Sequence, residues 1–539
     1  MSSKALPKGD VSEKTFVGAI DQGTTSSRFI LFNRSGDIVS SAQQEFTQHT
    51  PNEGECEHDP MEILASVLNT IKGALEGSNP KNTLKRDIKP SEIASIGITN
   101  QRETTVVWNK DTGKPYYNAL VWMDMRTKSI CDDLIKKHPA GQDQLRDKVG
   151  LPISPYFAGT KLKWLLGQED KLSGAGTVND AALRGEVLFG TIDTWLLWNL
   201  TGGPKSGVHV TDVSNASRTL LMDIKSCAWD EGICSNLGIP VSVLPKICSS
   251  SEIYGHGVDD GPVPQVPFAG VLGDQQAALF GQAAYDPGQA KNTYGTGCFM
   301  LVNTGKNCVP STHGLLTTVA YKLGKDAETV YALEGSVAFA GAAVGWLKNN
   351  LQIIDAPQEV TDKAAKDNGG VYFVPAFAGL YAPYWKDHAR GAILGLTRYA
   401  NKGHLLRATM EAVCFQTREV FDAMLQDCEQ QKVDVKLSQL RVDGGMTVND
   451  DILQAQADIL EIEVVRPVIV ETTALGAAYV AGLAVGFWSS IDDIKSQWKE
   501  NKRFKPDKSF VNEFRKWKKA VRRTMFWEGD EDPIMAVTE

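Results

Sequence analysis

The sequence lacks the patterns that hold structural zinc, disulfides or nucleic acid. Its nine cysteines are spread from Cys56 to Cys428 without a C-x-x-C pair, and an odd, scattered set indicates a reducing compartment. No Lys- or Arg-rich block stands out against a net charge of −9, so an affinity built on neutralising nucleic-acid phosphates is disfavoured. We therefore expect a cytoplasmic protein with no nucleic-acid partner.

Long apolar runs are also missing. The longest apolar stretch, residues 474–488, is rich in Ala and Gly and is shorter than the roughly 20 residues that span a bilayer. It predicts a buried packing helix and no transmembrane segment. Residues 1–15 mix charges around no apolar centre, which predicts a flexible tail rather than a secretory signal. A second tail is expected over residues 528–539.

Two common nucleotide-binding fingerprints are absent from the sequence. The pairs Gly113-Lys114 and Gly305-Lys306 lack both the earlier glycine and the following hydroxyl residue of a P-loop. No G-x-G-x-x-G follows a predicted strand either. A bound nucleotide would therefore have to be held by a different arrangement.

The pattern of elements predicts an α/β fold with more than one lobe. At 539 residues the chain exceeds the size at which one hydrophobic core keeps growing, so two lobes with a cleft between them are expected. Apolar runs alternate with helical patterns, which is typical of α/β proteins. Strands are predicted at 16–20, 28–32, 38–41, 93–98 and 104–108, and helices at 60–75 and 125–138.

The opening of the chain is repeated far downstream. The runs at 16–20 and 28–32 flank a polar turn that contains a glycine, which predicts a β-hairpin. A comparable hairpin is predicted over residues 290–302, just after turn-forming residues at 285–289. We therefore predict an N-terminal lobe over 16–284 and a C-terminal lobe over 285–527, each beginning with the same motif.

Both hairpin turns carry the chemistry of a phosphate-binding turn. In the first, Gly23 permits close backbone approach, Thr24 and Thr25 supply hydroxyls, and Asp21 supplies a carboxylate for metal-bound water. The second turn, residues 295–297, has the sequence Gly-Thr-Gly. An ordinary turn made of common turn residues is the alternative in both places.

Two further candidates lie where predicted strands end. Asp274 follows an apolar strand, and carboxylates at strand ends that face a cleft are good catalytic candidates. An Asp in front of a helix is also a common N-cap. Gly444 and Gly445 would let a flat adenine ring approach the backbone, or would serve only a strand-to-helix turn.

Opposite charges stand side by side between two predicted strands. In a turn, Arg102 and Glu103 can line one pocket and bind a polyol from two sides, whereas a surface ion pair is the alternative. Trp122 and Phe299 are candidate apolar walls for such a pocket. Most tryptophans are core residues, so packing alone would also explain Trp122.

Taken together, these residues resemble the FGGY family of carbohydrate kinases, and they closely match its members that phosphorylate glycerol. The matching segments are DQGTTSSR at 21–28, GITNQRET at 97–104, GDQQAALFGQ at 273–282, NTYGTGCF at 292–299, and GAILGL at 391–396 with HLLRATME at 404–411. The resemblance extends from about residue 16 to about residue 527. It implies two actin-like, ribonuclease H-like lobes with the active site in the cleft between them.

The resemblance also implies a role for each matched position, with ATP and Mg²⁺ as cofactors. Asp274 would be the general base on the attacking glycerol hydroxyl, and Asp21 and Asp274 would lie near Mg²⁺. The glycerol pocket would be formed by Arg102, Glu103, Trp122, Tyr156, Asp274, Gln275 and Phe299. ATP would be held by Thr24, Thr25, Ser26, Arg28 and Thr296 at its phosphates, and by Gly341, Gly445 and Asn449 at its nucleoside.

Two positions depart from the family pattern. Gly345 stands where many glycerol-phosphorylating members carry a glutamine near the nucleotide, and Ala158 stands where a small hydroxyl residue is usual. Two rival functions stay open: a kinase for another polyol or ketose, such as xylulose or gluconate, and an actin- or Hsp70-like nucleotide switch. We also expect a homo-oligomer, either a dimer or a tetramer.

Overall fold

The structure is a computed structural model that describes residues 14–386, 388–433, 435 and 437–528. The chain divides into two compact units. The first unit comprises Met1–Ala283, Thr317–Tyr331 and Thr472–Trp498, and the second comprises Ala284–Leu316, Ala332–Glu471 and Lys499–Glu539.

This division differs from the predicted domain limits in the second half of the chain. Its first border follows Ala283, one residue before the predicted border. Residues 317–331 and 472–498 belong to the first unit, whereas the predicted lobe over 285–527 includes both segments. Apolar patterning shows that a segment is buried but not which core buries it. The predicted tails lie outside the described residues except for residues 14, 15 and 528.

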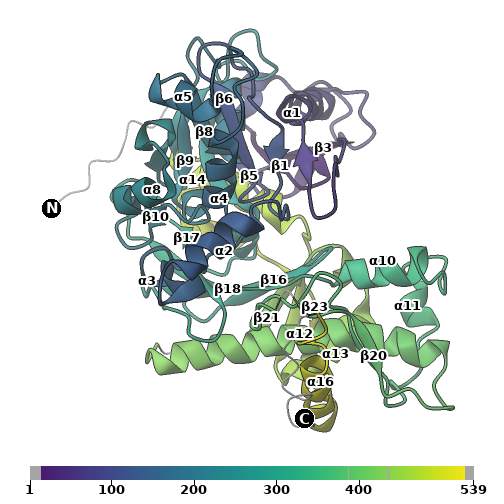
Figure 1. The fold of residues 1–539 in the computed structure, drawn as a ribbon. Helices are drawn as coiled ribbons and strands as arrows, with labels where there is room; N and C mark the ends of the chain where they lie inside the picture. Colours follow the sequence, from purple (N-terminus) through teal and green to yellow (C-terminus); the bar gives the residue numbers. More distant parts are fainter. Residues whose placement is uncertain (1–13, 387, 434, 436, 529–539) are drawn as a thin grey trace. The chain divides into compact units, whose positions relative to one another are not determined.

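A mixed six-stranded sheet forms the centre of the first unit (Figure 1). The predicted hairpin is present, because β1 runs antiparallel to β2, and β1 also pairs in parallel with β5, which pairs in parallel with β14. This arrangement brings the C-terminal ends of three parallel strands to one edge. The strands lie in the order β13 (Ser251–His256), β14 (Pro267–Gly273), β5 (Ile93–Asn100), β1 (Phe16–Gln22), β2 (Ser26–Phe32) and β3 (Ile38–Glu45).

Helices cover this sheet. Helix α1 (Pro60–Leu75) begins at Asp59, whose carboxylate accepts a hydrogen bond from the backbone N–H of Met61, and it packs on β2 and β3. Helix α14 (Thr472–Val485) packs against β5, β14 and α9 (Asp274–Gly281), which confirms the predicted packing helix. Glycines permit this contact, because a Cβ on Gly97 would lie 2.1 Å from the carbonyl oxygen of Ala477.

A smaller sheet and several short helices complete the first unit. Four short strands pair in the order β4 (Glu57–His58), β7 (Ala119–Leu120), β6 (Thr105–Asn109) and β8 (Val187–Thr191). The helices that bear on the site are α2 (Lys128–Lys136), α4 (Ala158–Leu166), α6 (Ile192–Leu200) and α7 (Val213–Ala216). The loop between β7 and α2 carries Trp122, and the segment just before α4 carries Tyr156.

The second unit contains the repeated hairpin. Strand β15 runs antiparallel to β16 and parallel to β21, which in turn runs parallel to β22. The strands of this sheet that belong mainly to the second unit lie in the order β18 (Val330–Val337), β16 (Cys298–Gly305), β15 (Ala290–Tyr294), β21 (Gln439–Asp443), β22 (Glu463–Pro467) and β23 (Glu500–Phe504). Its helices include α10 (Gly341–Asn349), α12 (Lys402–Gln430), α13 (Asp450–Leu460) and α16 (Val511–Arg522).

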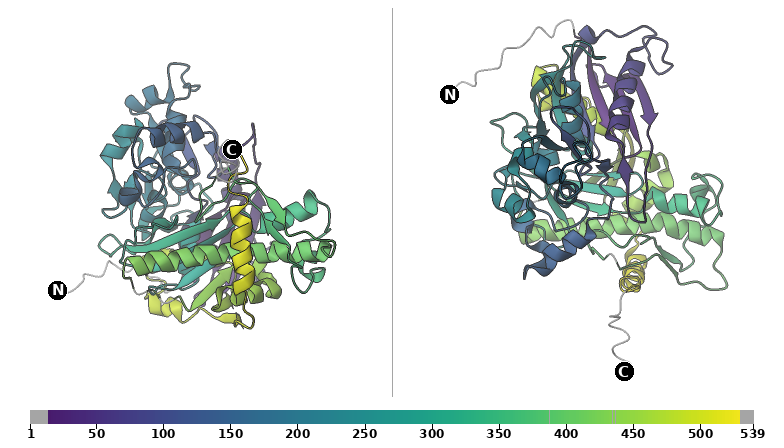
Figure 2. Two further views of the ribbon diagram at one scale, coloured as in Figure 1. Left: turned by 60° about the horizontal axis from the view of Figure 1, so that its bottom comes forward. Right: turned by 45° about the horizontal axis from the view of Figure 1, so that its top comes forward.

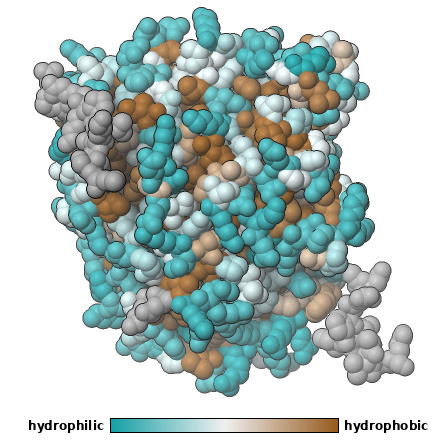
Figure 3. Space-filling view, turned by 90° about the vertical axis from the view of Figure 1, so that its left-hand side faces the viewer, coloured by the Kyte–Doolittle hydropathy of each residue, from teal (hydrophilic) through white to brown (hydrophobic). Residues whose placement is uncertain are grey.

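Helix α12 is the longest helix of the second unit, and α16 crosses it in the left view of Figure 2. Phe415 of α12 stacks on Trp517 of α16 with ring centroids 5.5 Å apart. On the face drawn in Figure 3, hydrophobic residues are interspersed among hydrophilic ones. No helix in the described ranges is long and apolar enough to cross a membrane.

A buried glutamate on α12 makes the stability of the second unit depend on pH. Glu419 is fully enclosed and accepts a hydrogen bond from the Tyr384 hydroxyl at 2.5 Å, and its burial raises the pKa of the carboxyl from 4.5 to about 7. Because this folded-state pKa lies above the unfolded value, the folded protein binds the extra proton. The stabilising contribution is complete below about pH 4.5 and is lost as the pH rises to about 7.

We predict that Glu419→Gln becomes stabilising relative to the natural chain as the pH rises. The expected gain reaches about 1 to 3 kcal/mol above about pH 7, because the variant has no charge to bury. Thermal denaturation of both proteins at several pH values between about 5 and 8 measures the difference. A difference that does not change with pH would contradict the raised pKa.

Candidate active site

The first hairpin turn is closed by its own backbone and stiffened by an ion pair. Gly23 N–H donates to the carbonyl of Ser26 at 2.9 Å. Across the hairpin, Arg28 Nη2 donates to Asp21 Oδ2 at 2.5 Å, with Asp21 buried and Arg28 about one-third exposed. The hydroxyl residues Thr24 to Ser26 therefore stand at the end of two paired strands, where Thr25 is exposed.

A second support joins this turn to the end of β5. Gln101 Nε2 donates to Gln22 Oε1 at 3.1 Å and to the carbonyl of Gly23 at 3.2 Å. Gln101 N–H also donates to the carbonyl of Gln22 at 2.7 Å. The predicted phosphate turn and the Arg102-Glu103 segment are thus held together by backbone and amide hydrogen bonds.

Arg102 and Asp274 form an ion pair at the ends of β5 and β14. Arg102 Nε lies 3.1 Å from Asp274 Oδ1, and the side chains are 2% and 32% exposed. Gly273 is required there, because a Cβ on it would lie 2.6 Å from Arg102 Cδ. Asp274 is the first residue of α9, after the N-cap Gly273, and its Oδ1 also accepts a hydrogen bond from the backbone N–H of Gln275 at 2.7 Å. The carboxylate is left partly accessible at the end of a parallel strand.

At Glu103 the chain turns away from the direction of β5, and the Glu103 side chain pairs with a residue other than Arg102. Its φ of 61° lies in the left-handed region, which is rare for a residue other than glycine and is found at functional sites. Arg218 Nε donates to Glu103 Oε1 at 2.6 Å, and both side chains are buried. The surface ion pair between Arg102 and Glu103 is therefore excluded, because each is paired with a residue far away in the sequence.

Arg218 was not predicted from the sequence. Its guanidinium lies 5.8 Å from the ring centre of Tyr156 and 5.4 Å from that of Phe157. It follows α7, whose N-terminus is capped by Asp212. The sequence around Arg218 does not distinguish it from any other arginine. Its importance comes from its ion pair with Glu103, which is 115 residues away in the sequence.

Two aromatic residues stand beside these charges. The rings of Trp122 and Tyr156 meet edge to face with centroids 5.6 Å apart. Lys161 of α4 is fully buried and donates to the backbone carbonyls of both, at 3.4 Å to Trp122 and 2.9 Å to Tyr156, as well as to that of Pro155. Burial lowers the pKa of this lysine to about 8. Lys161 is a second site residue that the sequence did not indicate.

The predicted nucleotide residues of the second unit also converge. Gly341 N–H donates to the carbonyl of Gly295 at 3.0 Å, and Ala342 N–H donates to that of Thr296 at 3.1 Å. A Cβ on Gly341 would lie 3.6 Å from Met446 Sδ, so the loop that contains Gly445 borders the start of α10. No atom lies within 4 Å of a Cβ built on Gly445, which leaves open space beside it.

The surroundings of three other predicted residues, Asn449, Gln275 and Phe299, and of Gly345, which departs from the family pattern, are as follows. Asn449 caps α13 through its side-chain oxygen and donates from Nδ2 to Thr361 Oγ1 at 2.9 Å. Gln275 is buried in α9, and Phe299 lies partly exposed in β16 of the second unit. Gly345 faces open space, with no atom within 4 Å of a Cβ built on it.

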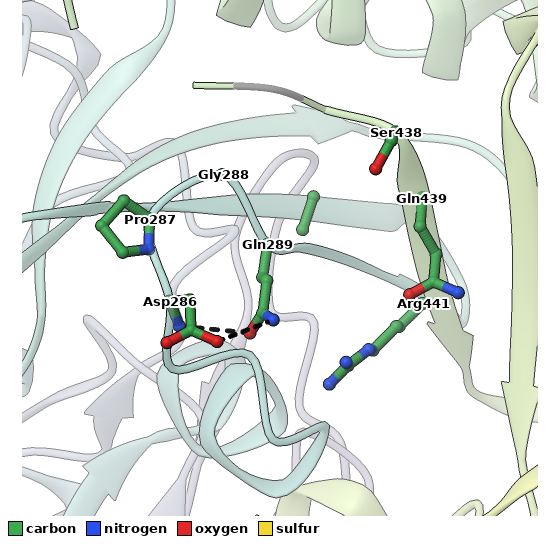
Figure 4. A pocket seen from close by; sticks show the side chains of 8 residues that line it. Asp286, Pro287, Gly288, Gln289, Ser438, Gln439 and Arg441 are labelled. Carbon is green, nitrogen blue, oxygen red and sulfur yellow. Dashed lines mark hydrogen bonds between the residues drawn. The ribbon is translucent and has the colours of Figure 1, made fainter. Parts of the chain in front are cut away.

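A separate cavity lies in the second unit and contains none of the predicted residues. It has a volume of about 170 Å³ between the turn before β15 and strand β21 (Figure 4). Asp286 and Gln289 are joined there by two hydrogen bonds of the Gln289 side chain and one between their backbones, each of 3.1 Å. Arg441, whose pKa is lowered by burial, extends toward them from β21.

The chain belongs to the FGGY family of carbohydrate kinases. The family's N-terminal domain matches residues 16–281 and its C-terminal domain matches residues 290–485. The predicted fold is confirmed, since the chain has the α/β architecture of two actin-like, ribonuclease H-like lobes that its structural relatives share.

Individual relatives within this family are kinases of particular substrates. A glycerol kinase of Brucella anthropi is 54% identical over 519 residues, which cover 95% of this chain and 99% of that protein. The crystal structure of Plasmodium falciparum glycerol kinase with ADP has a TM-score of 0.82 at 37% identity, over 95% of this chain and 98% of that one. A xylulose kinase from Lactobacillus acidophilus has a TM-score of 0.79 at 22% identity over 94% and 96%, which shows the common fold alone.

We predict that Arg218→Met destabilises the protein by about 3 to 5 kcal/mol, because Glu103 is then a buried charge without its cation. Replacing both residues, as Glu103→Gln with Arg218→Met, should cost less than Arg218→Met alone. Guanidinium denaturation of the full chain measures both effects. As a control, Arg86→Met removes an exposed ion pair with Glu92 and should leave the stability nearly unchanged. Equal losses in Arg86→Met and Arg218→Met would contradict the prediction.

Proposed function

We propose that this chain catalyses the ATP-dependent phosphorylation of glycerol to glycerol 3-phosphate. The observation that carries the proposal is the 54% identity to a glycerol kinase over nearly the whole of both chains. The site geometry supports it, because the buried Glu103–Arg218 pair lies beside the Tyr156 ring, which meets the Trp122 ring, and Arg102 forms a second pair with Asp274 at the ends of β5 and β14. Charged donors and acceptors next to apolar rings suit a small polyol.

In this proposal, each side of glycerol meets a different kind of residue. Arg102 and Glu103 bond hydroxyl groups, and Gln275 adds a polar contact. Trp122, Tyr156 and Phe299 cover the carbon atoms. Arg218 and Lys161 keep the pocket in shape: Arg218 pairs with Glu103, and Lys161 holds the backbone of the two aromatic residues.

Asp274 is proposed as the general base. A primary hydroxyl is a weak nucleophile at neutral pH, and a carboxylate within hydrogen-bond reach accepts its proton while the bond to phosphorus forms. The ion pair with Arg102 fixes the direction of this carboxylate. The partial exposure of Asp274 leaves the carboxylate accessible to a substrate hydroxyl.

We propose the following residues for the binding of ATP and Mg²⁺. Thr24, Thr25, Ser26, Arg28 and Thr296 would contact phosphates, and Gly341, Gly445 and Asn449 would border the nucleoside. The donor set fits Mg²⁺, which usually takes one or two protein carboxylates and completes its shell with waters and phosphates. Asp21 and Asp274 would hold it, and the ion would neutralise charge on the phosphates when bound.

Three further proposals concern the setting of the protein. We propose that it acts in the cytoplasm, that it does not bind nucleic acid, and that it assembles as a dimer or tetramer. The N-terminal lobe, residues 16–284, would bind glycerol and phosphates, and the C-terminal lobe would bind the nucleotide.

Glycerol is predicted to be the preferred acceptor over the rival substrates xylulose and gluconate. A site that bonds substrate hydroxyls discriminates strongly against an analogue that lacks one, so propane-1,2-diol should lose at least about 100-fold in kcat/KM. A coupled assay of ADP release across these compounds makes the comparison. Comparable kcat/KM for xylulose or gluconate would identify a different kinase of the same family, and ADP release that no acceptor increases would favour a nucleotide switch.

Asp274→Asn is predicted to abolish most turnover while leaving ATP and glycerol binding largely intact. The substitution keeps the size of the side chain but removes the proton acceptor, which typically costs about 10² to 10⁴-fold in kcat. Steady-state kinetics beside calorimetric binding of glycerol separate the two effects. Asp133→Asn, at an exposed position of α2, is the matched control. A near-normal kcat in Asp274→Asn would place the base elsewhere.

A further inference from the structure

Trp122 is fixed at three points by three different segments of the first unit. Its backbone N–H donates to Thr104 Oγ1 at 3.2 Å, and its carbonyl accepts from Lys161 Nζ at 3.4 Å. Its indole Nε1 donates to Thr24 Oγ1 at 3.0 Å. The third bond joins the proposed glycerol wall directly to the proposed phosphate turn, although the two residues are 98 positions apart in the sequence.

This bond determines which way the Thr24 hydroxyl can act. An indole N–H is a donor only, so Thr24 Oγ1 must be the acceptor, and the single hydrogen of the hydroxyl is left to point elsewhere. Within the described part of the chain, Thr24 Oγ1 donates to no acceptor. The carbonyl of Thr24 is separately occupied by Gln48 Nε2 at 3.1 Å. Thr24 is therefore a partly exposed hydroxyl presented as a hydrogen-bond donor.

We infer that Trp122 is a positioning residue for ATP as well as a wall for glycerol: its indole N–H orients the Thr24 hydroxyl so that this hydroxyl donates to a phosphate oxygen. The inference rests on the proposed function. A phosphate oxygen accepts but does not donate when ionised, so a hydroxyl that already accepts from Trp122 has the complementary polarity. One side chain thus serves both substrates, with its ring facing one and its N–H acting on the other.

A simpler role for the bond is to stabilise the turn, and that role has a different signature. Loss of a purely structural bond would lower the melting temperature and weaken both substrates together. Loss of an orienting bond acts on ATP selectively, because Trp122→Phe keeps a flat aromatic ring against glycerol but removes the N–H.

The test compares four variants of the full chain: Trp122→Phe, Thr24→Val, Thr24→Ser and the double variant Trp122→Phe with Thr24→Val. Trp122→Phe should raise the KM for ATP by about 3- to 10-fold, the effect of one hydrogen bond, while the KM for glycerol changes less. Thr24→Val should raise it further, and Thr24→Ser, which keeps the hydroxyl, should lose less than Thr24→Val. In the Thr24→Val background, Trp122→Phe should add no further loss, because there is no hydroxyl to orient.

Trp229→Phe is the matched control. It removes another indole hydrogen bond of the first unit, from Trp229 Nε1 to the carbonyl of Pro245 at 2.7 Å, and should leave the KM for ATP unchanged. The inference is overturned if Trp122→Phe raises both KM values in parallel, or if the effects of Trp122→Phe and Thr24→Val multiply in the double variant.

Calorimetric measurement of MgATP binding to the same variants tests the inference independently of the proposed function. If the natural chain phosphorylates no glycerol, the proposed function fails, whereas weaker MgATP binding in Trp122→Phe with the same non-additivity would still support the role of the indole. Equal MgATP affinity in Trp122→Phe and the natural chain would overturn that role whatever the acceptor is.

Discussion

Two buried arginines near the end of the central sheet each need an acidic partner, and the geometry of the site depends on these two ion pairs. Arg102 and Arg218 are both almost completely buried, and an unpaired cation at such positions would cost several kcal/mol. Asp274 satisfies the first and Glu103 the second. The two pairs therefore fix the ends of β5 and β14 and the segment after α7 relative to one another, and with them the direction of the carboxylate proposed as the general base.

A buried polar network in the first unit supports these two ion pairs. Asp212 accepts from the backbone N–H groups of Ser214 and Asn215 and from the hydroxyl of Ser250. Ser214 Oγ in turn accepts from Gly273 N–H at 3.0 Å, immediately before Asp274. Burial raises the pKa of Asp212, and these donors act against that effect. One capped turn thus supports both Arg218 and Asp274.

Local chemistry in the sequence was sufficient for much of the fold. The hairpin around Gly23, helix α1 and the repeated hairpin at β15 and β16 all follow from turn residues and hydrophobic periodicity. Arg218 and Lys161 could not be found in this way. Their roles depend on partners that only the tertiary fold brings close. For the same reason, the assignment of residues 317–331 and 472–498 to the first unit was not predictable.

Helix α14 has a consequence for how the protein is made. It covers β5 and β14 of the first unit, yet it begins at Thr472, whereas the main segment of that unit ends at Ala283. During synthesis, the face of the central sheet that α14 covers stays exposed until most of the second unit has been translated. This face is apolar and includes the glycines that contact α14. The first unit can therefore complete its core only after residues 472–498 have left the ribosome.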